Sequence, residues 1–214
     1  MAGPKKVKPP GLLETSYKKD TAEFNRVISL SDAVFAIAMT LLVLTLDIPD
    51  VTGAGLAGAL ADQLTQFIAF VLSFILVAII WVQHHSFMAR LGRLEPVLIG
   101  LNLALLGVVV SVPYPTNLIG NDPTSRVAVI IFISVFIILS LLYLLLAVRT
   151  QAVKAWIEPV SVNHFYWILA SWGAGIMVML AALVLSFWYP LAGLIILAVS
   201  MVFGPLASRL TYME

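Results

Sequence analysis

The sequence predicts an all-α integral membrane protein, a bundle of six transmembrane helices. Of its 214 residues, 61% are hydrophobic and only 11% are charged, so a soluble domain of this composition would lack a polar surface. Several apolar stretches approach the roughly 20 residues that a helix needs to cross a hydrocarbon core. Short polar breaks separate these stretches, and little of the chain is left for a soluble domain.

An N-terminal arm and two spans occupy the first part of the chain. Residues 1–25 contain five lysines and three prolines, and we expect them to form a mobile cytoplasmic arm. The first span is predicted at about 27–46, because Asp47 and Pro49 end its apolar run. The second span is predicted at about 64–83, and a polar and charged stretch closes it.

The third and fourth spans flank a region of prolines and turn residues. The third is predicted at about 97–112, and the rigid sequence Pro113-Tyr114-Pro115-Thr116 is expected to end it. A turn-rich loop is expected at 117–125. The fourth span then follows at about 127–148.

The last two spans are joined by a tight aromatic turn. They are predicted at about 165–186 and 191–207, with Phe187-Trp188-Tyr189-Pro190 between them. The six spans together form one transmembrane domain at 26–209. A short cytoplasmic tail is expected at 210–214.

The placement of basic residues predicts the orientation. Cytoplasmic loops of membrane proteins collect Lys and Arg. If the chain starts inside, six spans place eleven of its twelve basic residues in cytoplasmic segments and leave Arg126 alone outside. We therefore expect a multi-pass protein of the cell membrane with both termini in the cytoplasm.

Composition also argues against several classes of function. A net charge of +1 does not favour a nucleic-acid partner. The chain has no cysteine, which excludes disulfides, thiolate metal sites and a cysteine nucleophile. No phosphate-binding glycine loop, Ser/His/Asp arrangement or paired carboxylates occur, so we expect neither an enzyme nor a cofactor.

The first span combines an apolar stripe with a buried acid. At about 100° per residue, six apolar side chains share one face, while Asp32 points roughly 140° away from its centre. An unpartnered carboxylate at that depth costs on the order of 2 kcal/mol or more, so Asp32 should have a hydrogen-bond partner. The simplest interpretation is a packing face opposite a structural acceptor. The apolar stripe comprises Leu30, Ala33, Ile37, Leu41, Leu44 and Ile48.

Polar side chains in the next spans are candidate partners. Trp81, His84 and His85 share one helix face and could donate hydrogen bonds to Asp32 or Ser31. A metal site is a weaker alternative, because two adjacent histidines without a carboxylate pair do not define one. Asn102 is expected to bond to a neighbouring helix.

The sequence leaves three alternatives open, of which the first is a channel. It lacks the potassium-filter sequence of carbonyl-lined pores, and its loops are too short for a re-entrant filter, so any ion path must be lined by helices. A proton- or cation-coupled secondary transporter would need ionisable groups near mid-membrane, and Asp32 is the one candidate. A non-transporting membrane scaffold is the third alternative.

The first span closely resembles a known family signature. Arg26, Ser31 and Asp32, followed by Ala-Val-Phe-Ala-Ile-Ala-Met-Thr-Leu-Leu-Val-Leu, resemble the first helix of the bacterial relatives of transmembrane protein 175, the endosomal and lysosomal potassium channel. The family pattern is Arg, three variable residues, Phe, Ser and Asp, and here Leu30 replaces the Phe. Weaker matches follow downstream, at Ser73-Phe74, Trp81, His84-His85, Asn102 and Pro113-Tyr114-Pro115-Thr116.

The resemblance implies a potassium-permeable cation channel without a carbonyl filter. First helices would line the central pore of a homotetramer, with passive K⁺ flux and modest selectivity over Na⁺. Ile37, Leu41 and Leu44 would form the constriction, and Thr40 would contribute a pore-lining hydroxyl. K⁺ would be the permeant ion, with no resident metal. The hydrogen-bond network that holds the pore helix would comprise Arg26, Ser31, Asp32, Trp81 and His84.

Overall fold

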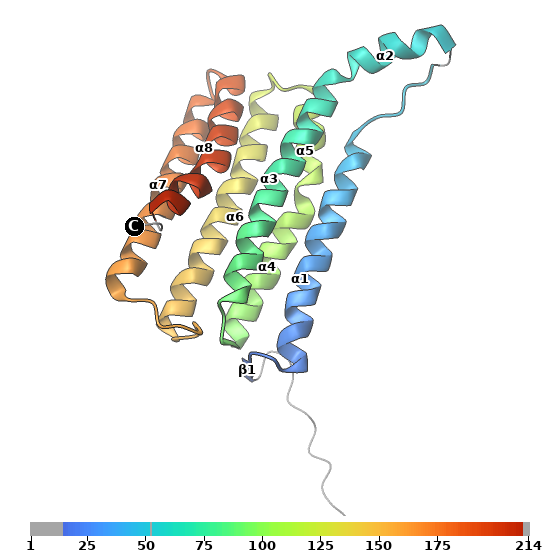
Figure 1. Ribbon diagram of the computed structural model, residues 1–214. Helices are drawn as coiled ribbons and strands as arrows, with labels where there is room; N and C mark the ends of the chain where they lie inside the picture. The colour runs from blue at the N-terminus through green and yellow to red at the C-terminus, as the bar shows by residue number, and fades with distance from the viewer. Residues whose placement is uncertain (1–14, 52, 212–214) are drawn as a thin grey trace, which may run out of the picture.

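The computed structural model is a bundle of long helices that lie side by side (Figure 1). It describes residues 15–51 and 53–211, with side chains as far as Met201 apart from Ala54. Among the described residues, five helical segments are long and apolar enough to cross a membrane, which confirms the predicted all-α membrane class. They are Ala22–Thr45, Leu64–Ala89, Pro96–Asn121, Arg126–Ala152 and Val162–Leu185.

The count of six spans stays a prediction. The last helix, α8, covers Pro190–Thr211. Its part with described side chains, Pro190–Met201, is apolar but shorter than a span. Of the expected tail at 210–214, the first two residues belong to α8 and the last three lie outside the described residues.

The first span is one α-helix that tightens at its end. Helix α1 covers Ala22–Leu41, and the Thr21 hydroxyl caps it by accepting a hydrogen bond from the backbone N–H of Phe24. The chain continues as a 3₁₀ turn, η1, over Leu42–Thr45. An extended Leu46 then ends the helical region before Pro49.

The link to the next span extends away from the bundle. A 3₁₀ turn, η2, covers Gly53–Gly55 and a short helix, α2, covers Leu56–Asp62. Figure 1 shows α2 projecting outward at the end of the bundle where the C-terminal end of α1 lies. Helix α3 then runs over Leu64–Ala89. It continues six residues past the predicted end of the second span, because the buried His84 is hydrogen-bonded within the bundle.

The third span ends at Ser111, close to its predicted end, but the proline-rich sequence after it begins a further helix where we expected a loop. Helix α4 covers Pro96–Ser111 and α5 covers Pro113–Asn121. Proline is tolerated in the first turn of a helix, where its missing N–H is not needed. The expected loop shrinks to 122–125. There the side-chain and backbone hydrogen bonds from Thr124 favour the carboxylate of Asp122 and lower its pKa.

The remaining helices complete the bundle on the side away from α1. Helix α6 covers Arg126–Ala152 and α7 covers Val162–Leu185, and serine side chains cap the N-termini of both. Helices α7 and α8 form the edge of the bundle opposite α1 (Figure 1).

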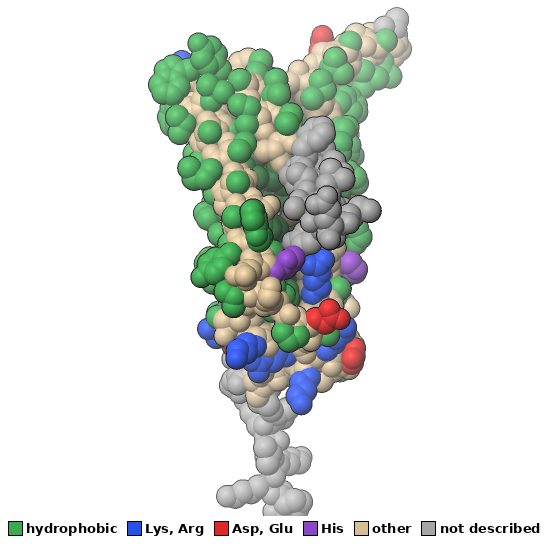
Figure 2. Space-filling view, turned by 60° about the vertical axis from the view of Figure 1, so that its left-hand side comes forward, with side chains coloured by type: hydrophobic (Ala, Val, Ile, Leu, Met, Phe, Trp, Pro, Cys, Tyr) green, Lys and Arg blue, Asp and Glu red, His purple; other side chains and the backbone are tan. Residues whose placement is uncertain are grey.

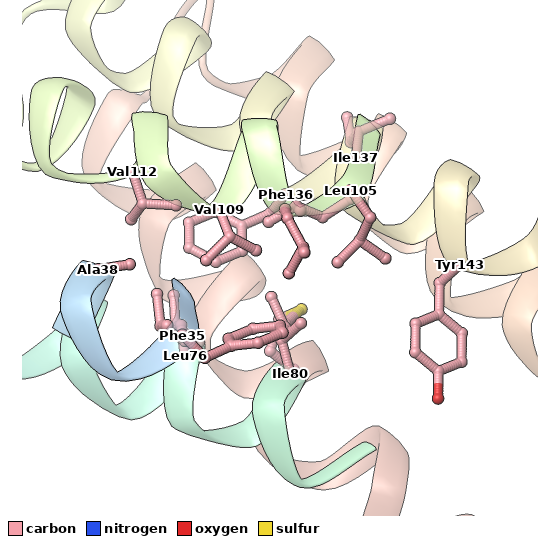
Figure 3. Close-up of a cluster of buried hydrophobic side chains, with 14 of the residues drawn as sticks. Phe35, Ala38, Leu76, Ile80, Leu105, Val109, Val112, Phe136, Ile137 and Tyr143 are labelled. Atoms are coloured by element: carbon pink, nitrogen blue, oxygen red, sulfur yellow. The ribbon is translucent and has the colours of Figure 1, made fainter. Parts of the chain in front are cut away.

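The core lies between α1, α3, α4 and α6. Figure 3 shows Phe35 and Leu76 facing Leu105 and Val109, with Phe136 beside them. All five side chains are fully buried. Because interiors are close-packed, this contact fixes which face of α1 points inward.

Most of the Lys and Arg side chains on the face shown in Figure 2 gather at one end of the bundle, which we call the basic end. There β1, Tyr17–Lys18, pairs antiparallel with β2, Arg93–Leu94. Residues 15–25 of the predicted mobile arm are therefore ordered as β1 and the start of α1, while residues 1–14 lie outside the described residues. Arg149 also pairs with both carboxylate oxygens of Glu95 at this end.

Candidate ion pathway along α1

Helix α1 has one buried and one exposed face. Its buried residues recur every three or four positions and pack against α3 and α4. On the other face, Ile37, Leu41 and Leu44 expose 55%, 37% and 74% of their surfaces. The predicted apolar stripe is thus the face of α1 that this single chain leaves uncovered. The exposed part of the stripe on α1 and η1 comprises Leu30, Ala33, Ile37, Leu41 and Leu44.

The C-terminal end of the apolar stripe does not have the α-helical spacing that the prediction assumes. The α-helix stops at Leu41, so Leu44 belongs to the 3₁₀ turn and Ile48 lies beyond the helical region. Ile48 is 93% exposed. Thr40 is also exposed, and its hydroxyl donates a 2.8 Å hydrogen bond to the backbone oxygen of Ile37.

A buried chain of hydrogen bonds joins α1 to α3 through α4. The Asn102 side-chain amide donates to Ser31 Oγ at 2.9 Å, and Ser31 Oγ donates to the Val27 carbonyl at 2.9 Å. The other end of the same amide, Asn102 Oδ1, lies 2.8 Å from His84 Nε2. Because an amide oxygen only accepts, His84 carries its proton on Nε2 in this arrangement.

The full burial of this chain makes it structurally important. Ser31, His84 and Asn102 are each at most 1% exposed. Losing one partner of a buried hydrogen bond costs about 1–3 kcal/mol, because the other partner is left unsatisfied. The arrangement holds α1 in one rotation relative to α3 and α4.

Asp32 forms a second, separate contact with α3. The indole N–H of Trp81 donates to Asp32 Oδ1 at 3.0 Å, and His85 Nδ1 lies 3.8 Å from the same oxygen. The structure thus brings together four of the five residues predicted to hold the pore helix, as two adjacent networks. Arg26 is exposed and forms no hydrogen bond or ion pair with any described residue.

Asn102 is the network residue that the sequence did not assign. We expected it to bond to a neighbouring helix, but not to bridge Ser31 and His84. The sequence feature that points to this role is a single amide side chain in an otherwise apolar helix. The sequence did not predict a further buried contact, in which Thr116 Oγ1 on α5 donates to Ser73 Oγ on α3 at 2.8 Å.

The described residues offer no ligand set for a resident metal. Among residues 15–51 and 53–211, no group of three or more His, Cys, Asp or Glu side chains lies close enough to hold an ion. The chemistry available along the exposed face of α1 is instead apolar, with one hydroxyl from Thr40.

The long apolar helices of the described residues define a multi-pass membrane protein. Residues 26–113 match the family described as the endosomal/lysosomal potassium channel TMEM175. The resemblance predicted from the first helix is thereby confirmed, and the chain is related to these channels over that region.

Two relatives and one solved structure extend the comparison. The chain is 38% identical over 126 residues to a potassium channel of Streptomyces collinus and 32% identical over 130 residues to one of Chamaesiphon minutus. These alignments cover 56% and 58% of this chain, and the chain spans 61% and 64% of the relatives' lengths. A crystal structure of a lysosomal potassium-selective channel TMEM175 homolog from Chamaesiphon minutus is similar, with a TM-score of 0.76 and 27% identity. That match covers 88% of this chain and 99% of the other.

Proposed function

We propose that the chain is one subunit of a potassium-permeable cation channel, in which four α1 helices surround a central pore. The observation that carries the proposal is the uncovered apolar face of α1, opposite a face held by buried polar bonds. Similarity to proteins named potassium channels supports it. Four identical copies form a closed ring, as a symmetric pore requires.

The constriction in this proposal is apolar. Ile37, Leu41 and Leu44 of four subunits face the axis and exclude water when they are closely apposed. A small rotation or separation of the helices then changes the pore between dewetted and conducting. Ions cross without a cage of carbonyl oxygens, so selectivity over Na⁺ is modest and rests on the larger dehydration cost of Na⁺. The Thr40 hydroxyl lies beside this region and offers one polar contact.

The network residues position the pore helix in this proposal. Ser31, Asp32, Trp81 and His84 fix the rotation of α1 through the bonds to α3 and α4. Arg26 is exposed at the basic end. In this proposal its side chain contacts a neighbouring subunit. The clustering of basic residues at this end supports an orientation in the cell membrane with both termini in the cytoplasm.

The alternative of a coupled transporter is less well supported. Its candidate ionisable group, Asp32, is bonded to the Trp81 indole rather than placed on the uncovered face of α1. A carboxylate held in this way acts as a structural acceptor.

Flux measurements in liposomes test the proposal. Purified protein in vesicles with a K⁺ gradient should pass K⁺ passively and bring the membrane voltage toward the K⁺ Nernst potential. A coupled transporter would need a second ion gradient for net movement, and a scaffold would pass nothing. Either result would contradict the channel assignment.

A further inference from the structure

We propose that Gln66 is a positioning residue for the apolar constriction, because it fixes the 3₁₀ turn that carries Leu44. This inference rests on the proposed pore along α1. The observation behind it is a second polar cluster, which lies at the end of the bundle opposite the basic end. The function proposed above does not use this cluster. We call it the outer clamp, and it comprises Asp47, Gln63, Gln66, Asn117 and Asn121.

The outer clamp holds Asp47 by all of its polar groups. Gln66 Oε1 accepts from the Asp47 backbone N–H at 3.1 Å, and Gln66 Nε2 donates to Asp47 Oδ2 at 2.7 Å. Gln63 Nε2 donates to the Asp47 backbone oxygen at 3.0 Å. Both glutamines belong to the start of the α3 region, so Asp47, two residues after the end of η1, is hydrogen-bonded to that region.

The base of the clamp is itself rigid. Gln66 Nε2 also donates to Asn121 Oδ1 at the end of α5. Helix α5 approaches α3 closely here, since a Cβ placed on Gly120 would meet Gln66 Cα at 3.4 Å and Ala69 Cβ at 3.6 Å. Asn117 reaches from α5 to the Thr45 carbonyl at 3.4 Å. The last turn of the pore helix is therefore bonded to α5 and, through Asp47, to α3.

The 3₁₀ turn η1, which lies just before Asp47 in the chain, decides where Leu44 points. Side chains three residues apart eclipse in a 3₁₀ helix, so η1 directs Leu44 along the line of Leu41. A continued α-helix would offset the two by about 60°, because three steps of 100° fall short of a full turn. Runs of 3₁₀ helix have poorer hydrogen-bond geometry than α-helix, so η1 depends on what holds it. Buried Leu42 and Thr45 hold one side, and the clamp holds the end.

The test uses the absence of cysteine in this chain. Leu44→Cys introduces a single thiol, and a cationic methanethiosulfonate reagent reports its accessibility through the current in planar bilayers. In this background, Gln66→Ala removes three hydrogen bonds and should raise the modification rate by at least roughly fivefold, the factor for one bond worth about 1 kcal/mol. In the cysteine-free protein the same substitution should move the K⁺/Na⁺ permeability ratio toward one. Thr65→Ala, at the neighbouring position and without a side-chain hydrogen bond among the described residues, should change neither quantity.

A pair of double variants separates the clamp from the charge near the pore mouth. Gln66→Glu places two carboxylates together and should act like Gln66→Ala. Adding Asp47→Asn restores a donor to the carboxylate introduced at position 66, so rate and ratio should return to within about twofold of the starting protein. Adding Asp50→Asn instead gives the same net charge without the contact, and should restore nothing.

Each outcome decides between the two ideas. If the reagent leaves the current of Leu44→Cys unchanged, the pore along α1 is wrong whatever Gln66 does. If the reagent acts but Gln66→Ala changes neither rate nor ratio, the positioning role is wrong. Should the position-66 variants fail to assemble, rescue of the tetramer by Asp47→Asn but not by Asp50→Asn supports the clamp. Rescue by both or by neither contradicts it.

Discussion

Asn102 on α4 and Ser31 on α1 are joined by a fully buried hydrogen bond of 2.9 Å, and the same amide group contacts His84 on α3. One side chain thus couples the three helices α1, α3 and α4. The rotation of α1, and with it the direction of its exposed face, depends on this amide.

Ser31→Ala should destabilise the protein by about 1–3 kcal/mol, because it leaves the Asn102 amide without its buried acceptor. Thermal unfolding in detergent measures the effect. Ser29→Ala is the matched control, since Ser29 is exposed on the same helix, and it should change stability little. A double variant with Asn102→Ala should cost less than the sum of the single changes, and strict additivity would refute the coupling.

Trp81→Phe should weaken the hold on α1 while keeping most of the ring packing. The change removes the indole N–H that donates to Asp32, and a hydrogen bond to a charged group is worth about 1.5–3 kcal/mol. Asp32→Ala should reduce the yield of assembled tetramer, measured by size-exclusion chromatography. Trp167→Phe, at a 76% exposed site, is the control. A stable Asp32→Ala tetramer with altered ion preference would place Asp32 in the ion path instead.

Ile37→Ala and Leu41→Ala should raise the leak current and weaken selectivity, because smaller side chains leave the constriction wider and wetter. Reversal potentials under K⁺/Na⁺ gradients measure the change. Both residues are exposed in the single chain, so the fold of the subunit should tolerate the changes. Leu145→Ala on α6, also exposed, should leave the currents as they were. Unchanged bilayer currents in both Ile37→Ala and Leu41→Ala would contradict the proposed constriction.

Thr40→Val keeps the side-chain volume and removes the hydroxyl. If the hydroxyl contacts passing ions, the K⁺/Na⁺ permeability ratio should shift by roughly twofold to tenfold, the range for one neutral hydrogen bond. The hydroxyl also bonds to the Ile37 carbonyl. Thr40→Ser keeps the hydroxyl and should preserve the ratio, so a shift in Thr40→Ser as large as in Thr40→Val would rule out the hydroxyl's role.

The membrane class and the two faces of α1 could be predicted from the sequence, because hydropathy and helical periodicity are local properties. The 3.6-residue spacing predicts an apolar stripe through Ile37 and Leu41, and both residues lie on the exposed face of α1. Ser31 and Asp32 were singled out because polar groups in an apolar span require partners.

Features that depend on tertiary contact could not be predicted in the same way. Helix α5 forms directly after Pro113 because buried Thr116 and Ile119 pack within the bundle, and the local turn signals of this stretch do not contain that packing. The 3₁₀ turn at Leu42–Thr45 depends on contacts with α3 and α5. The bridging role of Asn102 required knowing which helices are neighbours.

The pattern of cysteine accessibility along α1 tests the central claim most directly. In this cysteine-free chain, single substitutions Ile37→Cys, Leu41→Cys and Leu44→Cys should each make the K⁺ current sensitive to a cationic thiol reagent, while Val110→Cys and Leu145→Cys, exposed on α4 and α6, should not. A current that responds at Val110 or Leu145 but at none of the three α1 positions would show that another helix lines the path.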